Sequence, residues 1–156
     1  MQDFFHGYAL NGIDAKGRVS VPAAYRDVVE ARSKTRAVLL APHDSQPCLI
    51  GFDTAYSARL NEIIAARGDA LSAERDNAAL KLFGLSERFA YDEPGRIVLT
   101  ALQKELFELD RFAFFIAKGE TFEVWNPYRL IEAKEAAEPN IARTVRFCLK
   151  QKGEPA

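Results

Sequence analysis

One motif occurs twice in this chain, and the repeat limits the possible folds more than any other sequence feature. The segments "IDAKGRVSVP" (residues 13–22) and "YDEPGRIVLT" (residues 91–100) each place Gly three residues and Arg four residues after an Asp. At an offset of 78 residues, Asp14–Val28 aligns with Asp92–Leu106, and the polar, apolar and charged classes agree. Such self-similarity indicates two related structural units within one chain.

Each copy of the repeat has the pattern strand, turn, strand, helix, strand, turn, strand, helix. The strands are expected from short β-branched and aromatic runs bounded by turn residues, such as "RVSV", "RIVL", "AVLL" and "FEVW". Residues 37–42 and 48–52 of the first copy correspond to residues 112–117 and 122–126 of the second. We therefore predict an α+β fold built from two copies of one structural unit.

The Asp-x-x-Gly-Arg segments are expected to form tight turns. Gly17 and Gly95 can adopt the positive φ that most residues avoid. The carboxylates of Asp14 and Asp92 can accept hydrogen bonds from backbone N–H groups of their own turns and hold them rigid. The strands on either side are predicted to pair as a hairpin with the arginine at its tip.

Helix-start signals follow the predicted strands. Pro22 suits a first helical turn, and Thr100 begins a capping-box sequence. Asp53 is a candidate N-cap for a helix that is expected to stop at Gly68, and Asn126 precedes the corresponding helix of the second copy.

These patterns divide the chain into four predicted segments. The first repeat covers residues 5–56, a helical connection covers 57–88, the second repeat covers 89–135, and a C-terminal helix with a tail covers 136–156. The last helix groups apolar residues on one side and basic residues on the other. Its basic side is either a solvated face or a surface that contacts DNA or a neighbouring subunit.

Composition is typical of a soluble globular protein. The 156 residues are 48% hydrophobic and 28% charged, with a net charge of −1, enough for one ordinary domain or two small ones. No apolar run reaches roughly eighteen residues and no signal peptide is evident, so we expect no membrane partner and a cytoplasmic location. Cys48 and Cys148 lack metal-ligand spacing and are interpreted as apolar fillers.

Catalytic signals are weak. Asp14 and Asp92 are candidates for a symmetric catalytic pair, but their turn setting favours a structural role. His6 and His43 lie in an aromatic segment and a polar loop, where packing or solvation explains them. No phosphate-binding glycine loop is present. We therefore predict that the chain is not an enzyme and needs no cofactor, metal or small-molecule substrate.

The basic residues of the first turn suit a nucleic-acid contact. Lys16 and Arg18 place two cations on a small, stiff projection that the major groove can accept. The alternative is that Arg18 and Arg96 form ion pairs with the aspartates of their own solvated turns. Duplication of the motif favours the DNA-binding interpretation over a chance turn.

Motif and flanking residues together resemble the MraZ family, bacterial regulators of the division and cell wall gene cluster. The matching stretches are "DAKGRVSVPAAYR" and "DEPGRIVLTALQKE", preceded by "FHG" and followed by "CLIGF" and "FEVW". The resemblance extends from Phe5 to about residue 135 and covers most of the chain.

The resemblance implies the pseudo-two-fold swapped-hairpin β-barrel of AbrB-type transcription factors, built from two β-α-β repeats in one chain, with peripheral helices. Single-repeat relatives need a dimer, whereas this chain carries both interlocking halves. The resemblance also implies a homo-oligomeric ring that binds double-stranded DNA at direct repeats in the promoter of its own operon. Such a regulator is expected to act mainly as a repressor and to lie in the cytoplasm at the nucleoid.

The resemblance also implies roles for individual residues at the positions that match the family motif. Lys16 and Arg18 are expected to contact DNA, and Asp14 and Gly17 are expected to structure the turn. The second copy departs from this pattern, because Pro94 replaces the lysine and Glu93 adds an acid. Arg96 is therefore the weaker DNA-contact candidate, with Asp92 and Gly95 structuring its turn.

Two other functions remain open from the sequence. An AbrB-like antitoxin shares the barrel but uses an extended tail to neutralise a toxin, whereas the C-terminal region here has a helical pattern. A pure assembly protein would form rings that do not touch DNA. Binding to promoter DNA, compared with scrambled DNA of equal length, separates these possibilities from a regulator.

Overall fold

The computed structural model describes residues 3–69 and 72–156, and its elements repeat in the expected order. Residues 70–71, which fall in the predicted helical connection, and residues 1–2 lie outside the described part. The first half comprises β1 (Tyr8–Gly12), β2 (Arg18–Ser20), α1 (Ala23–Ser33), β3 (Ala37–Pro42), β4 (Leu49–Phe52) and α2 (Thr54–Ala65). The second half comprises β5 (Glu87–Ala90), β6 (Arg96–Val98), α4 (Ala101–Leu106), β7 (Phe112–Ala117), β8 (Phe122–Trp125) and α5 (Pro127–Lys134). Between them lie α3 (Ala73–Ala79) and the π-helical segment η1 (Leu80–Gly84), and α6 (Pro139–Gln151) follows the second half.

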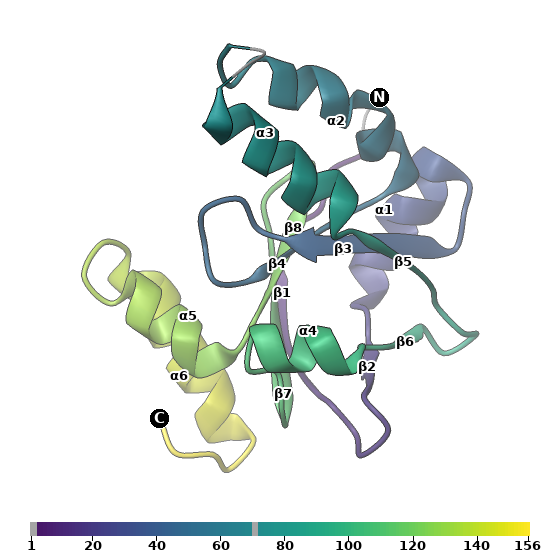
Figure 1. Ribbon diagram of the computed structural model, residues 1–156. Helices are drawn as coiled ribbons and strands as arrows, with labels where there is room; N and C mark the ends of the chain where they lie inside the picture. Colours follow the sequence, from purple (N-terminus) through teal and green to yellow (C-terminus); the bar gives the residue numbers. More distant parts are fainter. Residues whose placement is uncertain (1–2, 70–71) are drawn as a thin grey trace.

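Strands of the two halves are interleaved in one antiparallel sheet. The six-stranded sheet has the order β1-β7-β8-β4-β3-β5, and β2 and β6 form a separate two-stranded ribbon. Strand β1 of the first half therefore pairs with β7 of the second, and β5 of the second pairs with β3 of the first (Figure 1). The central pair, β4 with β8, also joins the halves.

The predicted pairing of the strands on either side of each turn is wrong beyond the turn itself. Asp14 N donates to Arg18 O at 3.0 Å, and Asp92 N donates to Arg96 O at 3.0 Å. After that contact the strands separate, because β1 pairs with β7 whereas β2 pairs with β6. Pairing β2 with β6 places Val19 opposite Ile97 and buries both side chains over one shared core.

That shared core lies between the ribbon and the six-stranded sheet. Among the described strands, no ladder joins the sheet edges β1 and β5, so the expected barrel appears as an open sheet covered by the ribbon. The α+β class is confirmed. The core includes the following buried residues from both layers: Val19, Val21, Tyr25, Leu40, Leu49, Ile97, Leu99, Phe115, Phe122 and Val124.

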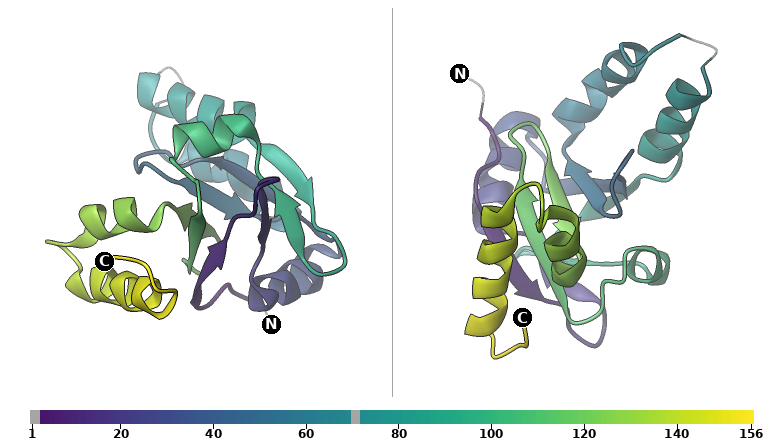
Figure 2. Two further views of the ribbon diagram at one scale, coloured as in Figure 1. Left: turned by 90° about the horizontal axis from the view of Figure 1, so that it is seen from below. Right: turned by 90° about the vertical axis from the view of Figure 1, so that its left-hand side faces the viewer.

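Two helical layers complete the molecule and lie apart from each other (Figure 2). Helices α5 and α6 enclose a cluster around Trp125 and Phe114, into which α6 inserts Val145 and Leu149. Helices α2 and α3 enclose a smaller cluster around Phe52. The predicted apolar side of the last helix is thereby confirmed.

Most predicted helix starts are confirmed. The Thr100 capping box is present, and the Asp53 side chain accepts a hydrogen bond from Tyr56 N at 3.0 Å. Asn126 caps α5. Helix α2 ends at Ala65, earlier than the predicted stop at Gly68.

Both cysteines are free thiols with different burial. Cys48 is buried in the cluster beneath α5 and α6, whereas Cys148 is half-buried on α6. Burial raises the pKa of each thiol above its ordinary value. Both side chains therefore act as apolar filling, as predicted from their sequence context.

Candidate nucleic-acid interface

The β2–β6 ribbon brings the two repeated arginines onto one surface. Arg18 lies opposite Val98, and Arg96 lies opposite Ser20. Val19 and Ile97 are buried between these positions, and side chains alternate between the two faces of a strand. The two arginines, which are 78 residues apart in sequence, therefore share the outer face of a ribbon made by both halves.

The first turn is held by the Asp14 carboxylate. Asp14 Oδ1 accepts hydrogen bonds from Lys16 N and Arg18 N, both at 2.9 Å, and Oδ2 pairs with Arg18 Nε at 2.6 Å. Gly17 has a φ of 81°. The Arg18 backbone N–H, followed by its side chain, lowers the pKa of Asp14. The carboxylate is therefore ionised at neutral pH and holds the turn in one conformation.

The second turn repeats this geometry. Asp92 Oδ1 accepts from Arg96 N at 2.7 Å, while Oδ2 contacts both Arg96 Nε and Nη2 at 2.9 Å. Gly95 has a φ of 96°. The Arg96 backbone N–H is the main cause of the lowered pKa of Asp92.

Both arginines form the intra-turn ion pairs that the sequence left as an alternative, yet neither is sealed from solvent. The side chains of Arg18 and Arg96 are 36% and 38% exposed. Within residues 3–69 and 72–156, the Nη groups of neither arginine make a hydrogen bond, although Arg96 Nη2 lies 2.9 Å from Asp92 Oδ2 as part of the ion pair. Arg18 is therefore both oriented by Asp14 and free to donate from its fork.

The tips of the two turns differ in charge. Lys16 is exposed at the tip of the first turn, and Pro94 occupies the matching position of the second. Glu93 is also exposed. The cationic part of the ribbon is thus concentrated at the first turn.

Two basic residues that the sequence analysis did not select cover the turn glycines from the opposite half. A Cβ at Gly17 would lie 3.3 Å from Lys104 Nζ, and a Cβ at Gly95 would lie 2.4 Å from Arg26 Cζ. Arg26 and Lys104 align at the same offset of 78 residues as the motif. The alignment in the sequence indicated that these two residues occupy equivalent positions in the two halves. Only the interlocked fold shows which turn glycine each of them covers.

A second pair of arginines lies beside the turns. Arg111 O accepts a hydrogen bond from Ile13 N at 2.8 Å, and Arg36 O accepts from Tyr91 N at 3.1 Å. Each of these arginines directly precedes a strand of one half and adjoins the turn of the other. Each turn is therefore flanked by two basic residues contributed by the opposite half.

The arrangement does not form a catalytic pair. Asp14 and Asp92 lie before opposite ends of the ribbon and are occupied by their own turns. His43 Nδ1 accepts hydrogen bonds from two backbone N–H groups, and its Nε2 lies 3.3 Å from Glu123 Oε2. His6 is exposed.

In the described part of the chain, no helix has both the length and the apolar character needed to cross a lipid bilayer.

Comparison with known proteins gives a consistent result, although no family model matches the chain. The chain is 35% identical over 125 residues to "Transcriptional regulator MraZ" of Gluconacetobacter diazotrophicus, covering 79% of this chain and 78% of that protein. It is 34% identical over 139 residues to the protein of the same name from Azorhizobium caulinodans, covering 86% and 87%. It is 32% identical over 141 residues to that of Rickettsia typhi, covering 90% and 93%.

These relatives are transcriptional regulators, so the expectation that the chain is not an enzyme is confirmed by its relatives. The likeness covers most of both chains. The chain belongs to the MraZ family of transcriptional regulators.

Proposed function

We propose that this chain is a sequence-specific DNA-binding regulator that reads DNA with the outer face of the β2–β6 ribbon. The observation that carries the proposal is the common exposure of Arg18 and Arg96 on one ribbon, with each arginine oriented by an aspartate of its own turn. A two-stranded ribbon fits the major groove.

Arg18 is the main base-reading residue in this proposal. Its Nε is fixed by Asp14, which leaves the Nη fork to make a bidentate contact with the O6 and N7 acceptors of guanine. Lys16 projects from the same turn toward a phosphate or a base. Because Asp14 and Gly17 already fix the turn, little conformational entropy is lost on binding.

Basic residues around the ribbon supply the sequence-independent part of binding. Lys104 and Arg26 cover the two turn glycines from neighbouring helices. Cations in these positions are suited to the DNA backbone, and their contacts release counterions. We therefore expect affinity to fall steeply with salt concentration.

Assembly into a homo-oligomeric ring is part of the proposal. An open apolar groove with a volume of about 310 Å³ lies between α4 and the segment around Leu85, and Leu102 and Leu106 line it with their side chains exposed. Exposed apolar surface of this kind supports contact with another copy of the chain. A ring would present several ribbons to repeated sites at high effective concentration.

The target proposed for this assembly is a set of direct repeats in the promoter of the chain's own division and cell wall operon. Binding there would repress transcription, and the protein would act in the cytoplasm at the nucleoid. The interleaved halves also support the AbrB-type swapped-hairpin architecture, with the ribbon closing over the sheet. An antitoxin role is less well supported, because residues 139–151 form a packed helix.

The decisive experiment is a gel-shift titration with DNA from upstream of the chain's own gene and scrambled DNA of equal length. Arg18→Ala is expected to abolish specific retention without changing the melting temperature. Arg59→Ala serves as a matched control, because Arg59 is an exposed, ion-paired arginine on α2, far from the ribbon (Figure 1). Unchanged affinity of Arg18→Ala would refute the proposal, and native mass measurement tests the ring.

A further inference from the structure

Arg111 lies beside the first turn but is not part of the ribbon. It shares the wall of an open cavity of about 570 Å³ with Asp14, Ala15 and Lys104. Its side chain is 71% exposed, and its Nη1 lies 2.6 Å from Glu154 Oε1. A cation so close to the proposed base-reading turn is thus held by a carboxylate from the C-terminal tail.

The tail carboxylate is held in place by the way α6 ends. Gly153 has a φ of 76° and donates from N to Lys150 O at 3.0 Å, and Glu154 N donates to Leu149 O at 2.9 Å. These two bonds are typical of a glycine C-cap, in which the chain reverses over the last helical turn. The Glu154 side chain is only 12% exposed.

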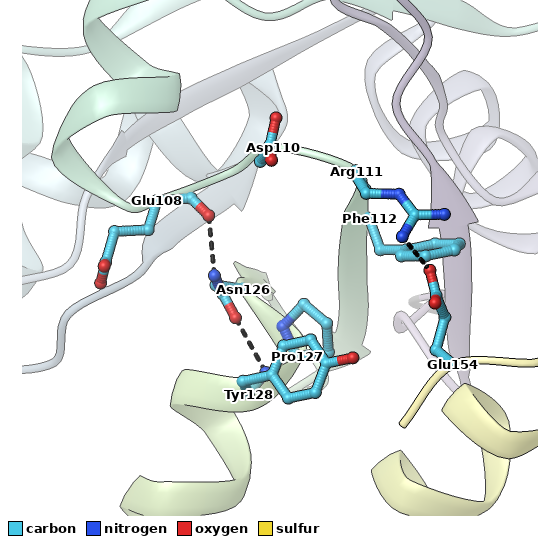
Figure 3. A pocket seen from close by; sticks show the side chains of 8 residues that line it. All are labelled: Glu108, Asp110, Arg111, Phe112, Asn126, Pro127, Tyr128 and Glu154. Carbon is cyan, nitrogen blue, oxygen red and sulfur yellow. Dashed lines mark hydrogen bonds and ion pairs between the residues drawn. The ribbon is translucent and has the colours of Figure 1, made fainter. Parts of the chain in front are cut away.

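Figure 3 shows the residues that line a cavity of about 190 Å³, and Glu154 of the tail forms part of its wall. Arg111 points toward Glu154 across Phe112, with the ring of Tyr128 below. Tyr128 also donates from its hydroxyl to Pro155 O at 2.9 Å. The tail is therefore held at Arg111 by the ion pair with Glu154. The Gly153 cap fixes the chain before Glu154, and the Tyr128 hydrogen bond to Pro155 fixes it afterwards.

The corresponding arginine of the first half is bound differently. Arg36 donates to Glu30 at 3.1 Å and to Asp92 O at 3.2 Å, and it stacks over the ring of Tyr91. All three partners lie in the folded repeats. Arg111 instead takes its carboxylate partner from the tail, an element that the first half does not have.

We propose that Arg111 contacts a DNA phosphate beside the first turn and that Glu154 competes with this phosphate for the guanidinium. This inference rests on the proposed DNA-binding function and adds a backbone contact and an internal competitor to it. A phosphate oxygen matches the guanidinium fork as well as a carboxylate does. The tail therefore lowers the affinity of the free protein for DNA.

The expected effect is moderate. An ion pair of an exposed arginine contributes roughly 0–1 kcal/mol, so a phosphate can displace the carboxylate readily. Removing the competitor should therefore tighten DNA binding by about two- to fivefold. Loss of the arginine should weaken binding and reduce the salt slope by about one phosphate contact per bound subunit.

The test is a double-mutant cycle in the full-length protein, with promoter DNA titrated at several salt concentrations. Glu154→Gln should bind two- to fivefold more tightly than the unmodified chain, and this gain should disappear in an Arg111→Ala background. Glu138→Gln, the same change at the exposed N-terminal end of α6, should have no effect. Gly153→Ala, which disfavours the positive φ of the cap, should also tighten binding without changing any charge.

The outcomes separate this inference from the proposed function. If neither the unmodified chain nor any variant retains promoter DNA specifically, the proposed function fails. If Arg18→Ala abolishes binding while Glu154→Gln and Arg111→Ala bind as the unmodified chain does, only the inference fails. A gain from Glu154→Gln that persists without Arg111 would also overturn it, because it would show a general charge effect. Melting temperatures of all variants exclude unfolding as the cause.

Discussion

The first and second turns of the ribbon share a backbone design and a hydrogen-bond pattern but differ in the charge of their tips. Arg18 and Arg96 are almost equally exposed, so accessibility does not distinguish them. Both arginines donate a hydrogen bond from Nε to their own aspartate, and the ion pairs differ only in detail: Arg96 Nη2 also lies 2.9 Å from Asp92 Oδ2, whereas Arg18 approaches Asp14 Oδ2 with Nε at 2.6 Å. The two copies therefore keep one structural design, while Lys16 in the first tip and Pro94 in the second give the tips different charges.

The helix caps of the two halves show the same kind of divergence. Asp53 caps α2 and is fully buried in an ion pair with Arg32, whose Nη2 lies 2.8 Å from Asp53 Oδ1. Asn126 caps α5 at the corresponding place without a charge. Among the described residues, Asp53 Oδ2 has no hydrogen-bond partner. The first half thus depends on a buried charge pair where the second half uses a neutral cap.

The largest expected effect on stability comes from removing the arginine of this buried ion pair. Arg32→Met should lower the free energy of unfolding by about 3–5 kcal/mol, because it leaves the buried Asp53 carboxylate without its counter-charge. Asn126→Ala should cost about 1 kcal/mol, the usual value of a lost N-cap. Urea denaturation measures both. Equal losses would show that the ion pair adds nothing to the capping role.

A second difference between the halves lies at the centre of the sheet. Ile50 of β4 lies opposite Glu123 of β8, so an apolar residue faces a buried acid. Burial alone would raise the pKa of Glu123, but hydrogen bonds from His43 and Trp125 and the charge of Lys118 together lower this pKa to about 2.

This acid should make the fold sensitive to low pH. A carboxyl group with a lowered pKa stabilises the folded state above its unfolded pKa, and this stability is lost as pH falls toward the folded pKa. We expect a loss of up to about 3 kcal/mol between pH 4.5 and pH 2. Unfolding measured across this range should show a smaller loss for Glu123→Gln, and an identical profile would contradict the assignment.

The two arginines provide the next test of the comparison between turns. Loss of one arginine–guanine contact removes about 1–3 kcal/mol of base discrimination. Arg18→Ala should show this loss in competition titrations with base-substituted DNA, and Arg96→Ala should show a smaller one. Equal losses would mean that the contact between Arg96 Nη2 and Asp92 Oδ2 does not restrain the guanidinium fork of Arg96.

The smallest expected effect, on DNA affinity, comes from placing the lysine of the first turn at the matching position of the second turn. Pro94→Lys should raise DNA affinity about two- to fivefold and steepen its salt dependence by about one contact. Pro94→Ala is the matched control for loss of the rigid ring. If both variants bind alike, the charge at this tip does not face DNA.

Local features of the fold follow from nearby residues. The Thr100 capping box, the Asp53 cap and the positive φ of Gly17 depend on side chains within a few positions of each other. Such contacts do not depend on where the segment packs in the fold, so they can be predicted from the sequence alone.

Pairing across the halves could not be derived from those residues. The short turn between β1 and β2 predicts that these neighbouring strands pair, whereas in the protein each pairs with a strand that lies far away in sequence. The expectation of interlocked halves came from the resemblance to a family and not from the residues of the strands themselves. For the same reason Lys104 and Arg111 were not selected as site residues, because only the interlocked fold brings them to the first turn.

The interleaved sheet also sets the order in which this protein can be completed during synthesis. Strands β3 and β4 pair with each other and can form early, but β1 has no partner until β7 has left the ribosome, about a hundred residues later. Throughout that interval β1 offers unpaired backbone groups to any other extended chain. We therefore expect the nascent chain to be most prone to aggregation, and to benefit most from a chaperone, after the first half is synthesised and before β7 emerges.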